Sequence, residues 1–534
     1  MYIQKIKSKY KDKEYTSVVL AENYRENGKV KRRIITTLTD WPESRIEEFQ
    51  KFLKGGRVVK IEDLPLKQGK SFGAMYVMNE IARQTGMIEA LGGGREGKMA
   101  LFQIYARLIT QGSRLYAATQ WAKNEAVEEI LGLKDFDEDD LYENLDWLAD
   151  NQLKIEKALY KKLREETKLV YLYDVTSSYL EGTENELAAY GYNRDKKKGK
   201  KQIVIGLLCN NEGEPVSVEV FEGNTSDMTT VSNQLKKLKE EFGVEKVAFV
   251  GDKGMLKSKQ IEEIKDMEWY YITSITKEQI RSLLNQGSIQ MELFEDEIME
   301  VEIEGVRYIM RRNEFRAREI HQNRVNKIDY IEAYIKEQNN YLQEHPRAKV
   351  STAIKKTGQK INKLKMEGFI EIKADYEGRN IQMIIDKKAI EETKQLDGCY
   401  VIKTNIKSVD ASKKEIHDRY KDLSEVEKAF RTMKTGLEEI RPIYVRKERR
   451  TRGHVFVCML AYKIMFHIWK CFKEDKIFTQ KYILESLDKI NIVEYTFADR
   501  TIKLLPKILT EDQQIILKRL NMKLPEKYVG NKFI

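Results

Sequence analysis

Cysteine is scarce in this chain, and hydrophobic residues never form a long run. Only 4 of the 534 residues are cysteines, and no two form a Cys-x-x-Cys pair, so neither a zinc site nor a disulfide framework is supported. The N-terminus, MYIQKIKSKYKDKEY, lacks the apolar segment of a signal peptide, and the longest apolar stretch is interrupted by Lys463 and His467. We therefore expect a soluble, cytoplasmic protein in a reducing compartment, with no membrane partner.

A large excess of one charge is also absent. The chain has 95 lysines and arginines against 85 aspartates and glutamates, a formal charge of +10, so clusters of basic residues carry more information than the total. What the chain does have is length. Its 534 residues exceed what one hydrophobic core supports and predict roughly three or four domains.

The first two regions differ in the period of their apolar residues. Residues 1–70 alternate polar and apolar positions around a turn at Asn27 and Gly28, which predicts a basic N-terminal β-hairpin domain. Residues 71–165 follow a helical period with glycines and basic side chains in the connections, which predicts a helical DNA-binding domain. An ordinary helical bundle fits this second pattern equally well.

Strand and helix patterns alternate in residues 166–280. Three consecutive strand patterns, LVYLYDVTSSYL, KQIVIGLLCN and PVSVEVFEG, precede a helix and a fourth strand, KVAFVGD. Three antiparallel strands followed, through a helix, by a parallel one give the order of an RNase H-like core. The predicted fold class is thus an α/β core, a mixed sheet with flanking helices, within a multidomain α+β chain.

This core pattern is then interrupted for more than a hundred residues. Residues 281–395 hold two hairpin patterns and two long polar helices, which predict an inserted α+β domain. The core pattern resumes at GCYVIKTN, so residues 396–475 are expected to complete the core and to carry a helix with Glu427. Residues 476–534 are expected to form a C-terminal helical region.

Two aspartates follow apolar, β-prone runs: Asp174 after LVYLY and Asp252 after KVAFVG. Each should therefore emerge at the carboxyl end of a buried strand, where open α/β sheets place their sites. A lone buried carboxylate costs several kcal/mol or takes up a proton, so these side chains must face water, a partner or a metal. Hard oxygen ligands on neighbouring strands suit Mg²⁺.

A third acid, Glu427, lies in the helical pattern YKDLSEVEKAFRTMK. On one continuous helix it would share a stripe with Tyr420, Arg431 and Lys434, beside an apolar stripe that packs on a sheet. Taken by itself, the helix is explained as well or better by a surface ion pair between Glu427 and Arg431.

Several motifs together resemble the DDE-class transposases of bacterial insertion sequences, in particular the group with a Tyr-x2-Arg-x3-Glu-x6-Lys signature and an inserted domain. The matching segments are YDVTSSYLEG (173–182), FEGNTSD (221–227), VAFVGDKGM (247–255), YKDLSEVEKAFRTMK (420–434) and RRTRGHVFVCMLAY (449–462). The signature arginine is replaced by Leu423. Leucine cannot hold a phosphate, so Arg431, or the basic residues beside Tyr420, would have to supply that contact.

The resemblance implies a chemistry and its partners. Asp174, Asp252 and Glu427 would be catalytic and would hold two Mg²⁺ ions, with Mn²⁺ able to substitute, Asp174 bridging both ions. Water would first nick the end of the element, and the freed 3′-OH would attack target DNA. The implied partners are double-stranded DNA, as terminal inverted repeats and target, and a second copy of the chain in a homodimer at the bacterial nucleoid.

Further residues are candidates for contacts with DNA or phosphate. Within the resemblance, Tyr420 and Lys434 would contact phosphate, Asn224 and Asp227 would orient the loop beside Asp252, and Trp269 would stack on an unpaired base. The loop RDKKKGKK, with Lys197, Lys198 and Lys200, can reach phosphate, and His454 could flank the DNA channel. Simpler roles remain open: a turn at Asn224, a solvated charge run, a core tryptophan and a helix-start histidine.

Two other functions remain open besides a transposase. One is a transposase-derived DNA-binding regulator that no longer cuts, against which the three retained acids argue. The other is a structure-specific nuclease with an RNase H-like core, which would cleave strands without joining them. The inserted domain and the motif GNTSD favour a transposase over this nuclease.

Overall fold

A computed structural model gives the structure of the chain. It describes residues 1–10, 13–55, 66–164, 170–195, 197–295, 297–435, 440, 443–497, 500–526, 528–529 and 532–533. The chain divides into two compact units. The smaller unit comprises residues 1–69, 491–506 and 526–528, and the larger unit holds the rest.

The smaller unit is built mainly of strands. β1 (Tyr2–Tyr10), β2 (Lys13–Glu26) and β3 (Lys29–Thr37) form an antiparallel sheet in that order, followed by helix α1 (Glu43–Leu53). Asn27 and Gly28 link β2 to β3 with φ values of 49° and 74°, as a tight hairpin turn requires. The predicted hairpin is therefore present, extended by a third strand.

The C-terminal region is not purely helical. It contains α18 (Gln480–Asp488) and α19 (Glu511–Arg519), but also β15 (Asn491–Phe497) and β16 (Arg500–Leu504). These two strands form a three-stranded sheet with β4 (Leu66–Ser71). The expectation of helices throughout is wrong here because the run NIVEYTF is rich in β-branched and aromatic residues, which favour a strand.

Residues 73–164 are helical, as predicted. The main helices of this module are α2 (Gly73–Gln84), α4 (Arg95–Ile109) and α8 (Glu138–Arg164). Both α4 and α8 pack on α17 (Glu448–Lys470) from the other end of the chain. α17 is buried along most of its length, with Val455, Met459 and Ile464 in the main core. Among the described helices, none is long and apolar enough to cross a membrane.

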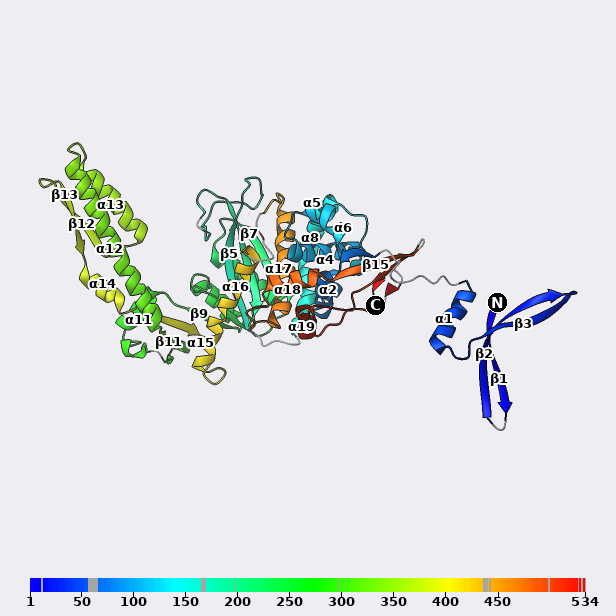
Figure 1. Ribbon diagram of the computed structural model, residues 1–534. Helices are drawn as coiled ribbons and strands as arrows, with labels where there is room; N and C mark the ends of the chain where they lie inside the picture. The colour runs from blue at the N-terminus through cyan, green and yellow to red at the C-terminus, as the bar shows by residue number, and fades with distance from the viewer. Residues whose placement is uncertain are drawn as a thin grey trace. The chain divides into compact units, whose positions relative to one another are not determined.

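An eight-stranded mixed sheet is the centre of the larger unit (Figure 1). β5 (Val170–Tyr179), β6 (Gln202–Asn210) and β7 (Pro215–Glu222) are antiparallel neighbours. β8 (Ala248–Val250) lies parallel to β5 on its other side, followed by β9 (Tyr270–Ser274). This is the strand order that the sequence predicts for the core.

The two faces of the sheet are covered by different helices. Tyr171 and Tyr173 of β5 belong to one hydrophobic cluster with α9 (Asp227–Lys236) and α10 (Ser258–Asp266). Leu172 belongs to the cluster that contains residues of α16 (Leu423–Thr435) and α17. Because side chains alternate along a strand, residues 172 and 174 share the face toward α16.

The hairpin at residues 299–312 belongs to this sheet and not to a separate inserted body. β10 (Met299–Ile303) pairs with β11 (Val306–Arg312), and β11 pairs with β14 (Cys399–Thr404), which pairs with β9. Alternation predicts the hairpin, but it does not say which sheet the hairpin joins.

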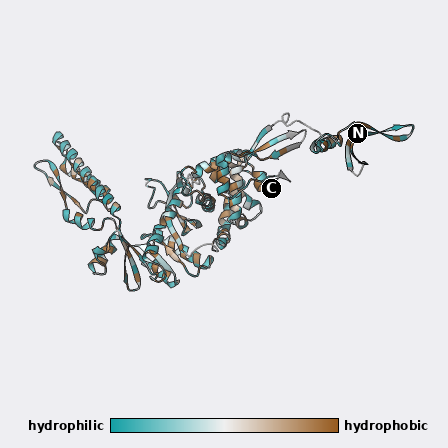
Figure 2. Ribbon diagram, turned by 60° about the horizontal axis from the view of Figure 1, so that its bottom comes forward, coloured by the Kyte–Doolittle hydropathy of each residue, from teal (hydrophilic) through white to brown (hydrophobic). Residues whose placement is uncertain are grey.

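Part of the interrupted region has its own core. This core is formed by α12 (Glu314–Glu344), α13 (Val350–Leu364), β12 (Ile370–Asp375) and β13 (Asn380–Ile385), which α14 (Lys387–Lys394) follows in the chain. Ile331, Ile335 and Ile361 are buried in its cluster. Most residues of its long helices are hydrophilic (Figure 2).

Arg307 connects the hairpin at residues 299–312 to the segment that leads to helix α15 (Lys413–Lys421). It is 2% exposed, and its Nη1 donates to the carbonyls of Ile406 (2.9 Å) and Ala411 (2.8 Å) in that segment. Its Nη2 pairs with Glu300 at 2.6 Å. One planar guanidinium thus satisfies three acceptors.

Replacing Arg307 with lysine should destabilise the protein by about 1–3 kcal/mol, because one ammonium cannot reach all three acceptors and leaves buried carbonyls unpaired. The measurement is chemical denaturation. The matched control is Arg316→Lys, since Arg316 makes an exposed pair with Glu319 on α12 and should change stability by less than about 0.5 kcal/mol. Equal effects of the two changes would contradict the role given to Arg307.

Candidate active site

The early end of strand β8 creates the site. In the parallel pairing of β5 with β8, Leu172 lies opposite Val250, and two further residues along each chain bring Asp174 level with Asp252. β8 ends at Val250, whereas β5 continues to Tyr179. Asp174 therefore lies in the middle of its strand and not at its end, because TSSY keeps pairing with β6. Asp252 follows its strand as predicted.

Glu427 approaches from helix α16 (Leu423–Thr435). Val426, Ala429, Phe430 and Met433 are buried, so the predicted apolar stripe packs this helix on the core and the sheet. The predicted single helix is wrong, because the chain turns at Asp422 between α15 and α16. Tyr420 and Glu427 therefore reach the same place from two helices.

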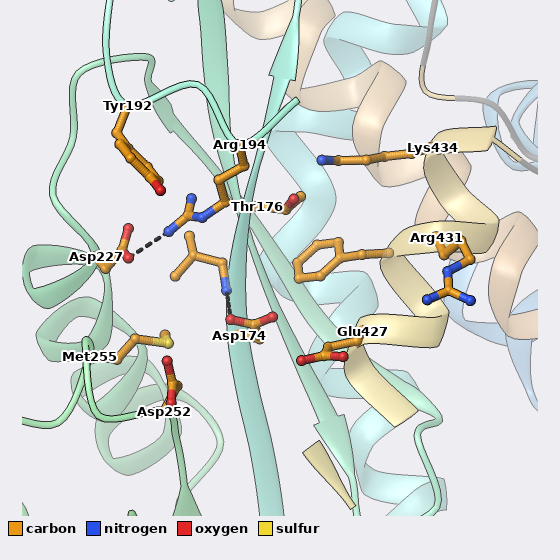
Figure 3. A pocket seen from close by; sticks show the side chains of 12 residues that line it. Asp174, Thr176, Tyr192, Arg194, Asp227, Asp252, Met255, Glu427, Arg431 and Lys434 are labelled. Carbon is orange, nitrogen blue, oxygen red and sulfur yellow. Dashed lines mark hydrogen bonds and ion pairs between the residues drawn. The ribbon is translucent and has the colours of Figure 1, made fainter. Parts of the chain in front are cut away.

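The three acids line one open pocket of about 410 Å³. Figure 3 shows the Asp174, Asp252 and Glu427 side chains pointing into the same space. The complete lining consists of Asp174, Val175, Thr176, Tyr192, Arg194, Asp227, Asp252, Met255, Glu427, Phe430, Arg431 and Lys434. Four acidic and three basic side chains in one concave site make this the strongest candidate for chemistry in the described structure.

Asp174 carries the most perturbed charge of the pocket. Its pKa is raised to about 7, mainly by burial and to a smaller extent by the carboxylates of Glu427 and Asp252. The backbone N–H of Val175, which donates to Oδ1 at 2.7 Å, and the Arg194 guanidinium act in the opposite direction. The carboxylates together thus favour a bound cation or proton.

Two basic residues of the pocket, Arg194 and Lys434, form ion pairs with aspartates. Arg194 Nη2 pairs with Asp227 at 2.5 Å, and the Arg194 backbone N–H donates to Ser177 Oγ at 3.1 Å. Lys434 Nζ pairs with Asp195 at 3.2 Å. These pairs hold two cations at the edge of a pocket that also holds four acids.

Comparison with known proteins decides the class. The family model described as "Transposase DDE domain" matches residues 165–464, the segment that carries all three acids. The chain belongs to the DDE transposases. A second model, "IS1634 family transposase, N-terminal domain", matches residues 3–60, so the protein is an insertion-sequence transposase.

Other comparisons add little. No curated protein matches the transposase. Among solved structures, the piggyBac transposase synaptic complex with hairpin DNA matches with a TM-score of 0.36 and 8% sequence identity, covering 78% of this chain and 76% of that chain.

Tyr420 of the transposase lies against an acid of the pocket. Its hydroxyl donates to Ser274 Oγ at 2.7 Å and lies 3.4 Å from Asp252 Oδ1. Burial raises the pKa of Tyr420 to about 12, so the hydroxyl keeps its proton and acts as a donor. Leu423, which stands at the position of the signature arginine, packs against the hydrophobic core.

Two predicted DNA contacts are wrong. Trp269 is 1% exposed, and its indole N–H donates to the Glu245 carbonyl at 2.9 Å, so no base can stack on it. His454 is 3% exposed, and its ring nitrogens contact the Ile440 carbonyl and Arg114. A buried imidazole with both nitrogens occupied cannot itself flank a DNA channel.

The remaining predicted residues are divided between the pocket and its surroundings. Asp227 and Arg431 line the pocket, whereas Asn224 is exposed outside it. Lys197 lies over the Tyr179 ring, 5.6 Å from its centroid, and Lys200 pairs with Glu181 at 2.7 Å. Lys198 is exposed.

The sequence does not point to Tyr192 as a site residue, and it includes Arg194 only as the first residue of the basic run RDKKKGKK. Tyr192 is 84% exposed and lines the pocket. Its carbonyl accepts from the buried Gln202 side chain at 3.1 Å. The aromatic residues just before the basic run were the available clue, but nothing in the sequence shows that their loop folds back over β5.

Replacing Asp174 with asparagine should stabilise the metal-free transposase in a pH-dependent way. With a folded-state pKa of about 7 against about 4 in the unfolded chain, the wild type loses stability as the pH rises from 4 to 7. The variant should therefore melt at a higher temperature than wild type at pH 8, and the gain should shrink toward pH 4. Thermal melts with a chelator measure this.

The control for this pH series is Asp150→Asn, which changes an exposed carboxylate on α8 that pairs with Arg449. A gain for Asp174→Asn that does not depend on pH, or a loss at pH 8, would show that Asp174 is not held at an electrostatic cost.

Proposed function

We propose that this transposase cuts DNA at the ends of its own insertion sequence and joins the freed 3′ ends to target DNA. The observation that carries this proposal is the convergence of Asp174, Asp252 and Glu427 in one open pocket that is also lined by Arg194 and Lys434. Phosphoryl transfer requires both kinds of charge, because negative ligands hold metal ions and positive groups hold the phosphate.

The donor set of the pocket fits Mg²⁺. Its acids offer the oxygen ligands that this ion prefers, and the pKa of Asp174 is raised by burial and by the neighbouring acids. Asp174 and Asp252 would hold one ion, and Asp174 and Glu427 a second. Among the described residues, no group of three or more His, Cys, Asp or Glu side chains is already arranged to hold a metal ion. Bound Mg²⁺, or Mn²⁺ in its place, would activate the attacking oxygen and stabilise the leaving one.

The protein's own residues would position the DNA. Arg194, steadied by Asp227, and Lys434, steadied by Asp195, lie where they can bind the oxygens of the scissile phosphate. Tyr420 would orient Asp252 through its hydroxyl. Tyr192, exposed at the pocket, would contact the nucleotide beside that phosphate.

The partners extend beyond the pocket. We propose that the sheet is an RNase H-like core, that the helical module at 71–165 and the loop with Lys197, Lys198 and Lys200 hold double-stranded DNA, and that two copies of the chain assemble around two ends. The DNA would be the terminal inverted repeats and the target, in the bacterial nucleoid.

The test uses the purified full chain, Mg²⁺ and a duplex of the DNA that flanks its reading frame. Nicking at the element end, followed by joining to a second duplex, is the expected result. Binding without any nicking would favour the non-cleaving regulator. Nicking without joining would favour a structure-specific nuclease.

Replacing Glu427 with glutamine should abolish nicking, a fall of at least about a hundredfold, because an amide does not replace a carboxylate as a metal ligand. Binding of the end duplex should persist, because the change removes a negative charge from a DNA-binding site. Gel assays of nicking and of binding measure the two effects separately.

The matched control is Glu425→Gln on the same helix, where Glu425 pairs with Lys428 at 2.6 Å and does not line the pocket. It should retain nicking. If Glu427→Gln retained strand joining, Glu427 would be removed from the metal site.

A further inference from the structure

A second cluster of cations lies in the helical module, at the junction of α4 with α5 (Arg114–Tyr116). Arg107 is in the last turn of α4, and Arg114 begins α5. The two arginines, with Gly112 and Ser113 between them, line adjoining cavities of about 20 and 70 Å³. None of the residues that line these cavities belongs to the acidic pocket.

Among the described residues, the hydrogen-bond partners of the Arg114 side chain are uncharged. Its Nε donates to Gln103 Oε1 at 2.7 Å, and its Nη2 lies 3.1 Å from His454 Nδ1. His454 Nε2 lies 2.9 Å from the Ile440 carbonyl, which can only accept, so Nε2 carries the proton and Nδ1 accepts from Arg114. Burial and the nearby arginines hold the pKa of His454 well below its usual range, so the imidazole is neutral.

Neither guanidinium forms an ion pair with a described carboxylate, and Glu138 affects the pKa of Arg114 less than Arg107 does. Among the described residues, no carboxylate lies within ion-pair distance of Arg107 or Arg114. Burial, followed by the repulsion from Arg107, lowers the pKa of Arg114 to about 10. Two like charges that share a partly buried site without a counter-ion are unfavourable, and a bound anion would remove that cost.

Aromatic side chains surround these cations. Arg114 and Arg450 both lie over the Tyr142 ring, 5.6 and 5.3 Å from its centroid. Tyr444, which lines the larger cavity, is 74% exposed, and Tyr116 is 48% exposed. Exposed aromatic groups beside uncompensated arginines are typical of nucleic-acid contacts.

The segment that carries the cations is fixed in place. Ser113 caps the helix by accepting from the Tyr116 N–H at 3.1 Å. A side chain at Gly112 would come within 2.6 Å of the Tyr116 ring. Arg114 is therefore held in position before any ligand binds, which lowers the entropy lost on binding.

We propose that Arg107 and Arg114 bind a backbone phosphate of duplex DNA, at a site separate from the acidic pocket. His454 acts as a positioning residue, because its neutral ring orients Arg114 without neutralising it. The proposal rests on the proposed function and adds to it: this contact anchors the duplex and carries no sequence information.

The test measures binding of the flanking DNA duplex and of an unrelated duplex over a range of salt concentrations, with a chelator present so that no cutting occurs. The variants are Arg107→Gln and Arg114→Gln. Each should weaken binding to both duplexes alike and reduce the slope of log affinity against log salt by about one.

The matched control is Arg83→Gln in the same module, because Arg83 is already paired with Glu80 on α2 and should leave the slope unchanged. Arg107 is half-buried, whereas His454 is buried, and Arg107→Gln carries the test if Arg114→Gln does not fold. A loss of thermal stability without any change of slope in Arg107→Gln would mean a structural role and overturn the proposal.

Two further outcomes are distinguished. If inorganic phosphate stabilises the wild type but the duplex slopes do not change in either variant, the site takes a free anion and the DNA assignment is wrong. If the wild type binds neither duplex, the proposed function itself fails.

Discussion

The whole site depends on one feature of the sheet, the short strand β8. Because β8 ends at Val250 while β5 continues to Tyr179, the middle of β5 has no strand beside it on that side. The Asp174 carboxylate can therefore open into a pocket at the level of Asp252. The alternation of side chains sets the face, and α16 is the helix that covers this face and brings Glu427 to it.

Unbalanced charges at two places in the structure lower the stability of the ligand-free protein. Asp174 is pushed toward its protonated form by burial and by two neighbouring acids, and the α4–α5 junction holds two arginines without a described counter-ion. The acidic pocket has more acidic than basic side chains, and at the α4–α5 junction no described carboxylate forms an ion pair with Arg107 or Arg114. Charge imbalance of this kind is common where a protein binds ions or charged ligands, since the ligand supplies the opposite charge.

Part of this structure can be predicted from the sequence. Apolar runs and turn residues predict the strands of the core and the hairpin at Asn27 and Gly28, because these depend on local chemistry. Asp174 and Asp252 are predicted as site residues because a charged side chain beside a buried strand must face water, a partner or a metal. Glu427 was placed by its resemblance to a family signature, since helix geometry alone explained it equally well as part of a surface ion pair.

The rest depends on contacts between distant segments. The turn at Asp422 separates Tyr420 from Glu427, although the helical period runs through it. The partner of the 299–312 hairpin, the burial of Trp269 and the loop that brings Arg194 to the pocket are all set by tertiary packing. No local pattern specifies which sheet, core or pocket a segment will join.

The central claim is that the three carboxylates form one metal-binding site. The most direct measurement is anomalous diffraction from crystals grown with Mn²⁺ and the end duplex. The account predicts two Mn²⁺ peaks in the acidic pocket, one between Asp174 and Asp252 and one between Asp174 and Glu427. A well-ordered pocket with bound DNA and no peak beside Asp174 would contradict it.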